Sequence, residues 1–162
     1  MYTRVARWVA SWEGLEMASN GGADKPRVLL VDDDSEVVWA VGKFLTKCGY
    51  AITTCADGAE AIDLMASRDV DCVVTDIKMP NVNGVALVDW LRRNRPSVRV
   101  VVMTAFGSPY IRELVLGKGA VLYLEKPVDP QLLADVISRT DHKTAFSGTI
   151  SDIDIMEYLQ LM

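Results

Sequence analysis

Short apolar runs alternate with longer stretches in which apolar residues recur at helical spacing along most of the chain. A short apolar run bounded by turn residues predicts a buried strand, and apolar residues three or four positions apart predict an amphipathic helix. The pattern predicts strands at residues 27–31, 51–55, 71–75, 98–103 and 120–124, and helices at residues 35–48, 58–67, 84–93, 108–116 and 130–139.

Capping and turn residues support the ends of these helices. Ser35 is expected to be the N-cap of the first helix, because its hydroxyl can accept a hydrogen bond from a free backbone N–H. Gly49 is expected to end that helix. Asp129 as N-cap and Pro130 at the first helical position open the last helix, where the missing proline N–H costs nothing.

The order of the elements predicts the fold class. Strands that alternate with helices and are apolar throughout indicate a parallel sheet covered on both faces. With right-handed crossovers this gives an α/β fold with a doubly wound, five-stranded parallel sheet and helices on both faces, of the flavodoxin-like type. A ligand site is expected at the carboxyl ends of the strands, where the strand order reverses.

Polar residues follow four of the five predicted strands. Asp32 and Asp33 follow the first strand, Asp76 the third, Thr104 the fourth and Lys126 the fifth. The carboxyl ends of parallel strands meet at one edge of the sheet, so we expect these side chains to converge. A single aspartate at a strand end is usually a cap, and a single Lys-Pro pair is usually a turn. The interpretation therefore depends on their joint occurrence after the first, third, fourth and fifth strands.

The residue types in this cluster predict phosphoryl chemistry. Neighbouring carboxylates repel one another unless a cation or a proton neutralises them. Oxygen ligands of this kind, completed by water, suit Mg²⁺. Asp76 can then act as a nucleophile toward phosphorus and form an acyl phosphate. Lys126 would neutralise the charge of the phosphoryl oxygens, and the hydroxyl of Thr104 would donate a hydrogen bond to them.

Four segments of the chain resemble the response-regulator receiver family of two-component signalling, which is also called CheY-like. The likeness spans residues 27–140 and is carried by RVLLVDDDSEVV, DCVVTDIKMPNVNG, RVVVMTAFGS and GAVLYLEKPVDPQLL. The resemblance implies that Asp76 is the phosphoacceptor, and that Asp32 and Asp33 form the acidic pair that binds Mg²⁺ with it. Asp33 is the more direct ligand by this comparison, and Asp34 lies one place beyond the pair.

The same resemblance assigns the remaining site residues. The backbone carbonyl of Lys78 matches the position that completes the metal shell. Thr104 matches the switch hydroxyl, Tyr123 the switch aromatic residue and Lys126 the phosphate-binding lysine. Pro127 matches a proline that is preceded by a cis peptide bond in the family.

The implied function is that of a phosphorylation switch and not of an enzyme, apart from self-catalysed phosphorylation and dephosphorylation. The implied partner is a sensor histidine kinase or a phosphotransfer protein. On phosphorylation Thr104 is expected to move toward the phosphoryl group and Tyr123 to turn inward. The surface of residues 108–116, 120–124 and 130–139 would then change shape. A homodimer through this surface or through the C-terminal segment is a further expectation.

Three rival functions are compatible with a fold of this class. A phosphohydrolase with an aspartate nucleophile usually carries a second acid two residues later, where this chain has Lys78. An interaction module that works without phosphorylation would not need the complete set of acids, threonine and lysine. A nucleotide-binding domain would need a glycine-rich phosphate loop, and the sequence contains neither GxGxxG nor GxxxxGK[ST].

Composition narrows the setting of the protein. Half of the residues are hydrophobic and the formal net charge is −5, with no long basic run, which argues against a general nucleic-acid surface in this chain. No apolar run reaches the ~20 residues of a membrane helix. The first residues lack the apolar core of a signal peptide. Cys48, Cys55 and Cys72 form no CxxC pair and are expected to be buried, reduced thiols, which fits the cytoplasm.

The chain is expected to divide into three parts, with the receiver at residues 26–141. Residues 1–25 are an N-terminal extension, either a short amphipathic helix or a leader if translation starts at Met17. Residues 142–162 are read as a linker and the start of a C-terminal effector domain that is truncated at Met162. Their FSGTI segment and Leu159-Gln160 pair resemble the opening of a PATAN-type domain. Alternatively, this apolar segment packs on the receiver, promotes dimers or is a frayed end.

Overall fold

A computed structural model describes residues 25–139 of the chain. Five strands and five helices alternate along this part of the chain. The strands are β1 (Arg27–Val31), β2 (Ala51–Cys55), β3 (Cys72–Thr75), β4 (Arg99–Thr104) and β5 (Leu122–Glu125). The helices are α2 (Ser35–Lys47), α3 (Gly58–Ser67), α4 (Gly84–Asn94), α5 (Pro109–Gly117) and α6 (Pro130–Arg139).

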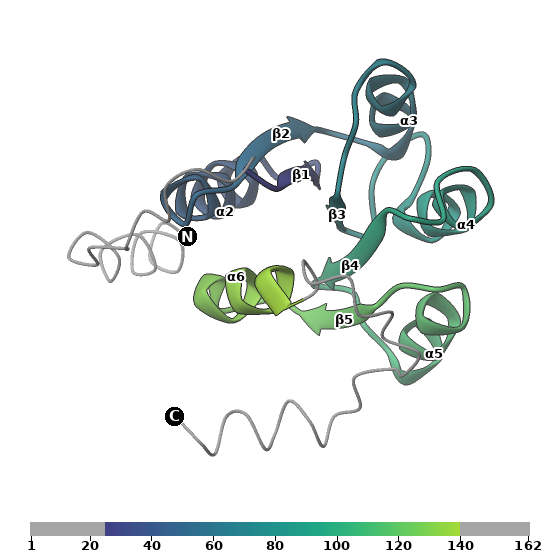
Figure 1. The fold of residues 1–162 in the computed structure, drawn as a ribbon. Coiled ribbons are helices and arrows are strands. Elements are labelled where there is room, and N and C mark those ends of the chain that lie inside the picture. The colour runs from purple at the N-terminus through teal and green to yellow at the C-terminus, as the bar shows by residue number, and fades with distance from the viewer. Residues whose placement is uncertain (1–24, 140–162) are drawn as a thin grey trace.

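The strands form one parallel sheet in the order β2-β1-β3-β4-β5. Helices α2 and α6 cover one face of the sheet, and α3, α4 and α5 cover the other (Figure 1). The predicted fold class is therefore confirmed. The chain passes from β1 outward to β2 and then returns to the other side of β1 as β3, so the strand order reverses between β1 and β3. This reversal opens a crevice at their carboxyl ends.

The alternation of side chains along each strand divides the core into two layers. In β1, Val28 and Leu30 pack toward α2 and α6, whereas Leu29 and Val31 pack toward α3, α4 and α5. All four side chains are at most 1% exposed. Successive residues of a strand point to opposite faces, so a strand buried on both faces has to be apolar at every position.

The first helix begins differently from the sequence-based expectation. Asp34, and not Ser35, is the N-cap of α2, and its carboxylate accepts hydrogen bonds from the N–H groups of Glu36 and Val37 at 3.0 and 3.3 Å. Aspartate and serine are about equally good caps, so preference alone did not separate two adjacent candidates. Gly49 follows the helix with a φ of +94°, a conformation that favours glycine. Other predicted element ends agree with the structure to within two residues.

The three cysteines are free thiols, as expected for a reduced protein. Cys55 and Cys72 are buried, but Cys48 is partly exposed because it lies at the C-terminal cap of α2. Burial raises the pKa of Cys55 to about 12 and that of Cys48 to about 11. Both thiols are therefore poor nucleophiles at neutral pH.

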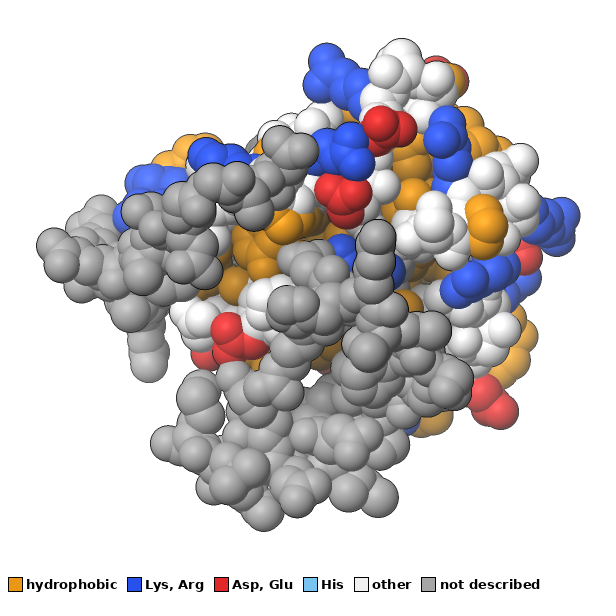
Figure 2. Space-filling model, in the orientation of Figure 1, with side chains coloured by type: hydrophobic (Ala, Val, Ile, Leu, Met, Phe, Trp, Pro, Cys, Tyr) orange, Lys and Arg blue, Asp and Glu red, His pale blue; other side chains and the backbone are white. Residues whose placement is uncertain are grey.

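Side chains of both charge signs are interspersed with hydrophobic ones on the described surface that faces the viewer in Figure 2. Within residues 25–139, no helix is long and apolar enough to span a membrane. The predicted N-terminal helix or leader and the PATAN-like segment lie outside the described residues.

Candidate functional site

The register of β1 and β3 brings two of the predicted site residues side by side. Val31 is paired with Thr75 at the ends of these strands, and the N–H of Asp76 donates to the carbonyl of Val31 at 2.9 Å. Asp32 and Asp76, the next residues, therefore leave the sheet at the same place. Both are buried, at 2% and 5% exposure. Buried carboxylates are uncommon unless they are paired or bind a metal, so their position at the crevice indicates a functional site.

Asp33 completes a cluster of three carboxylates. One oxygen from each of Asp32, Asp33 and Asp76 can be chosen so that all three lie within 4.8 Å of one another. Asp33 is exposed, so the cluster opens to solvent on its side. The neighbouring Asp34 turns away, since its carboxylate caps α2. The structure thus brings together the three acids predicted for the metal and separates the fourth from them.

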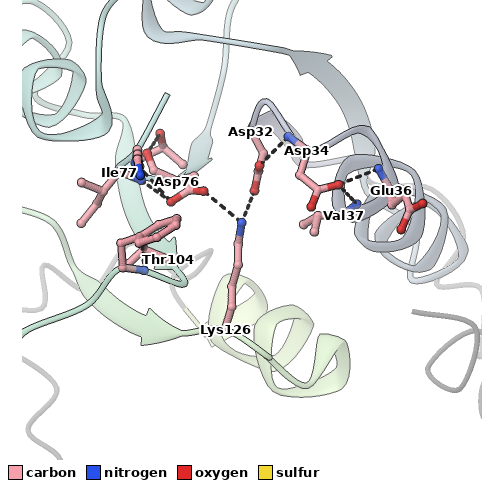
Figure 3. Close-up of polar contacts among 11 residues, drawn as sticks. Asp32, Asp34, Glu36, Val37, Asp76, Ile77, Thr104 and Lys126 are labelled. Carbon is pink, nitrogen blue, oxygen red and sulfur yellow. Dashed lines mark hydrogen bonds and ion pairs between the residues drawn. The ribbon is translucent and has the colours of Figure 1, made fainter. Parts of the chain in front are cut away.

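Lys126 bridges the two buried carboxylates from the end of β5 (Figure 3). Its Nζ donates to Oδ2 of Asp32 at 2.5 Å and to Oδ2 of Asp76 at 3.1 Å. Only 14% of its side chain is exposed. The Lys126–Pro127 peptide bond is cis, as the resemblance implied.

The electrostatic balance of this cluster is negative. Burial raises the pKa of Asp32, although the hydrogen bond from Lys126 partly opposes this effect. Burial lowers the pKa of Lys126, but its hydrogen bond to Asp32 and the charges of Asp32 and Asp76 outweigh burial, so its pKa is raised. One ammonium group is thus shared by two buried carboxylates with a third beside them, an arrangement that favours an additional cation.

The backbone around Asp76 fixes the direction of its carboxylate. Oδ1 accepts a hydrogen bond from the N–H of Ile77 at 2.5 Å and a longer one from that of Lys78 at 3.4 Å. Oδ2 points to Lys126. Gly84 begins α4 directly against this segment, because a Cβ at residue 84 would lie 2.0 Å from the carbonyl oxygen of Asp76. Gly84 is therefore required for the close packing of α4 against this segment.

Thr104 ends β4 as a fully buried residue, and its Oγ1 accepts a hydrogen bond from the N–H of Phe106 at 3.1 Å. Tyr123 is 7% exposed and packs in the layer under α3, α4 and α5. Its buried hydroxyl makes no hydrogen bond to a described residue. A Cβ at Gly107 would lie 2.0 Å from this hydroxyl oxygen, so the tyrosine ring fills the space beside the loop that follows Thr104.

Two contacts near the site were not indicated by the sequence pattern. The Nζ of Lys78 lies 4.2 Å from the ring centroid of Phe106, which is 59% exposed. Asn81, which has a φ of +57°, donates to the carboxylate of Asp57 at the start of α3. These contacts hold the loop after β3 from two sides. The paired residues lie 24 and 28 positions apart in the sequence, so neither contact could be predicted from a local pattern.

The donor set fits Mg²⁺. Mg²⁺ prefers hard oxygen ligands and commonly binds through a few carboxylates with water in its other positions. The cluster supplies three carboxylates, one of them exposed, and carries more negative than positive charge. The fold and this site together define a signal-receiver class of α/β domain with an acidic pocket whose ligands suit a divalent cation.

The comparisons with known proteins agree with this class. The sequence profile described as "Response regulator receiver domain" matches residues 28–138. The chain therefore belongs to the response regulator receiver family.

Similar proteins include longer regulators. The chain is 39% identical over 118 residues to the transcriptional regulatory protein PrrA of Mycobacterium tuberculosis, covering 73% of this chain and 49% of PrrA. It is 35% identical over 102 residues to the DNA-binding transcriptional regulator NtrC of Escherichia coli, covering 63% of this chain and 22% of NtrC. The chain thus spans half or less of the length of these relatives.

A solved structure also supports the fold. The CheY-like response regulator receiver domain protein of Methanospirillum hungatei is 26% identical to this chain. It matches with a TM-score of 0.70 over 72% of this chain and 94% of that chain.

Proposed function

We propose that this domain accepts a phosphoryl group on Asp76 from the phosphohistidine of a sensor histidine kinase or a phosphotransfer protein. The observation that carries the proposal is the bridge from Lys126 to both Asp32 and Asp76, with Asp33 completing a three-carboxylate cluster. Family membership supports the same function, because a receiver domain is a signalling module. An aspartate-based phosphohydrolase is not favoured, since Lys78 occupies the place where such an enzyme carries its second acid.

The chemistry begins at the carboxylate of Asp76. An oxygen of Asp76 attacks phosphorus, the bond from phosphorus to the imidazole nitrogen breaks, and the imidazole leaves with the bonding electron pair and takes up a proton. Lys126 neutralises charge on the phosphoryl oxygens, and the hydroxyl of Thr104 can donate to one of them. In-line transfer of this kind depends mainly on positioning and charge, so the fixed carboxylate of Asp76 matters more than any proton relay.

Mg²⁺ would be held by the carboxylates of Asp32, Asp33 and Asp76 and by the backbone carbonyl of Lys78. Bound there, the ion would share oxygens with the phosphoryl group and offset its charge. Asp33 is the exposed member of the acid cluster, which supports its role as the more direct ligand. Asp32 already accepts hydrogen bonds from Lys126 and from the N–H of Asp34, which supports a role in orienting the site.

Phosphorylation would change the surface formed by α5, β5 and α6. The phosphoryl group adds about −1.5 to −2 charges and new acceptor oxygens. Thr104 would give up the N–H of Phe106 as its partner and turn toward these oxygens. Tyr123 is already buried beside Gly107, so phosphorylation would stabilise this inward position over an outward one. Such coupling is worth roughly 1–3 kcal/mol and shifts a population.

The proposal also covers the domain boundaries, the location and the assembly of the protein. We place the receiver unit at residues 26–141, with residues 1–25 and 142–162 as extensions, of which the second resembles the start of a PATAN-type effector domain. A cytoplasmic location fits the free thiols. A homodimer through the α5-β5-α6 surface or the C-terminal segment is part of this proposal. One relative is a DNA-binding regulator, but we expect the receiver itself not to bind nucleic acid, since its chain carries a net charge of −5.

The test is phosphorylation in vitro. The chain is incubated with Mg²⁺ and acetyl phosphate, and the mass of the intact protein is measured. The parent should gain the mass of one phosphoryl group, and Asp76→Ala should gain none. A matched control is Asp129→Ala, which removes an exposed carboxylate that caps α6 and should label normally. Equal labelling of Asp76→Ala and the parent would show that the phosphoacceptor is another residue.

A further inference from the structure

A second pocket lies at the amino ends of the strands, opposite the carboxylate cluster. It is bordered by the starts of β1 and β4, the residues before β3 and the ends of α3 and α4. Its volume is about 500 Å³, which lies within the ~300–1,000 Å³ range of small-molecule sites. Four arginines and two aspartates line it, so the pocket has a formal charge of +2 in a chain whose net charge is −5.

Arg27 alone engages both acids of the pocket. Its Nε and Nη2 donate to the two carboxylate oxygens of Asp71 at 3.0 and 2.9 Å, and its Nη1 lies 3.2 Å from Asp69. Its backbone N–H donates to Asp71 as well. Arg27 thus binds both carboxylates of the pocket, and the charge of Arg99 also acts on Asp71.

Two other arginines are oriented by backbone carbonyls. Arg95 donates from Nη2 to the carbonyl of Met65 at 2.7 Å. Arg99 donates from Nε to the carbonyl of Asp71 at 3.4 Å. A carbonyl fixes a guanidinium group in place without neutralising its charge, and Arg95 retains further N–H donors. Arg68, directly after α3, adds an exposed guanidinium at the rim.

Apolar side chains form part of the same pocket. Met65 is buried near the end of α3. Val70, shortly before β3, and Val98, directly before β4, are half-buried. Guanidinium forks that match phosphate and carboxylate geometry, next to an apolar wall, are the usual elements of a site for an anionic organic molecule.

We propose that this pocket binds a small organic anion, with its phosphate or carboxylate group between Arg68 and Arg95 and its apolar part against Val70 and Val98. The proposal does not depend on phosphorylation of Asp76. The strand β1 separates the two sites, and its five residues span roughly 17 Å at the usual rise per residue. A ligand in the pocket would therefore not touch the cluster of Asp32, Asp33 and Asp76.

The test uses the ¹⁵N-labelled full chain without Mg²⁺, titrated with phenyl phosphate and followed by two-dimensional NMR. The amides of Arg68, Val70 and Ser97 should shift in a saturable way, and those of Thr104 and Lys126 should not. Inorganic phosphate should bind more weakly than phenyl phosphate, since it lacks a group for the apolar wall. Benzoate in a parallel titration distinguishes a general anion site, which binds both probes, from a phosphate-selective one.

Arginine variants decide whether the pocket itself binds the probe. The double variant Arg68→Ala/Arg95→Ala should weaken binding at least about tenfold, because it removes two charge-assisted donors. Arg93→Ala is the matched control, since Arg93 lies on α4 outside the pocket and pairs with Asp89 at 2.7 Å. The proposal is wrong if no pocket amide shifts at millimolar phenyl phosphate, if the shifts centre on Lys126, or if the folded double variant binds as tightly as the control.

Discussion

Replacing Lys126 by methionine tests the charge balance of the proposed phosphorylation site. Methionine keeps an unbranched apolar chain of similar length but removes the ammonium group that contacts Asp32 at 2.5 Å and Asp76 at 3.1 Å. The carboxylate side chains are 0% and 6% exposed, so water cannot replace the lost partner without local rearrangement. Two buried like charges then face each other without a cation.

The size of the effect follows from this burial. Removing one partner of a buried ion pair typically costs about 3–5 kcal/mol, because it leaves a buried charge uncompensated. Asp32 can relieve part of this cost by taking up a proton, since burial already raises its pKa. We therefore expect the free energy of unfolding at pH 7 without Mg²⁺ to fall by about 3 kcal/mol, the lower end of that range.

Urea denaturation followed by circular dichroism measures this loss. Lys118→Met is the matched control, because Lys118 contacts Asp89 at 2.8 Å but both side chains are about one-third exposed. Exposed pairs contribute roughly 0.2–1 kcal/mol, so the control should lose at most about 1 kcal/mol. Equal losses in the two variants would refute the argument that burial makes the Lys126 bridge essential.

The pH dependence of the free energy of unfolding provides a second test with the Lys126→Met variant. Without Lys126, the native pKa of Asp32 lies further above its unfolded value, so the native state binds more protons and stability falls as pH rises. The deficit relative to the parent should thus be largest at neutral pH and should shrink as pH falls through the raised pKa. A deficit that stays constant from pH 7 to pH 4 would contradict this origin.

Further variants probe the metal, the packing and the switch. Mg²⁺ at 100 times its Kd should stabilise the parent by about 2.7 kcal/mol in thermal denaturation, and Asp33→Asn should abolish most of this gain. Gly84→Ala should cost about 1–3 kcal/mol and slow phosphorylation, because its Cβ would lie 2.0 Å from a backbone oxygen. Gly117→Ala, with nothing within 4 Å, should instead be neutral or stabilising in the same urea titration. Gly107→Ala should displace the Tyr123 hydroxyl, and unchanged tyrosine ring resonances in NMR spectra would argue against that contact.

The fold could be predicted because its strands are apolar at every position and lie between helices. Arg27–Val31 illustrates this, since a run of four apolar residues has no polar face to expose and must be covered on both sides. Element ends were less predictable where neighbouring residues offered similar chemistry. Asp34 and Ser35 are both good N-cap residues. In the structure α2 begins at Ser35, so Asp34 is the cap.

The convergence of the site residues was predictable from strand ends alone, but their contacts were not. Asp32, Asp76 and Lys126 follow different strands, so parallel topology brings them to one edge. The sequence contains no signal that Lys126 would bridge both acids, because this depends on the register of β5 and the path of its following loop. The contact between Gly107 and Tyr123 likewise depends on the shape of a loop.

Two buried carboxylates that share one ammonium group are expected both to destabilise the fold and to attract a further cation, because both effects come from uncompensated negative charge. The apolar layers on both faces of the sheet stabilise the fold without help from the carboxylates. Burying Asp32 and Asp76 with a single shared ammonium group lowers the free energy of unfolding, and the packing of the two apolar layers offsets this loss. Any ligand that brings positive charge into the crevice would relieve this cost. We therefore expect a receiver with a neutral crevice to be more stable and to attract a divalent cation less strongly.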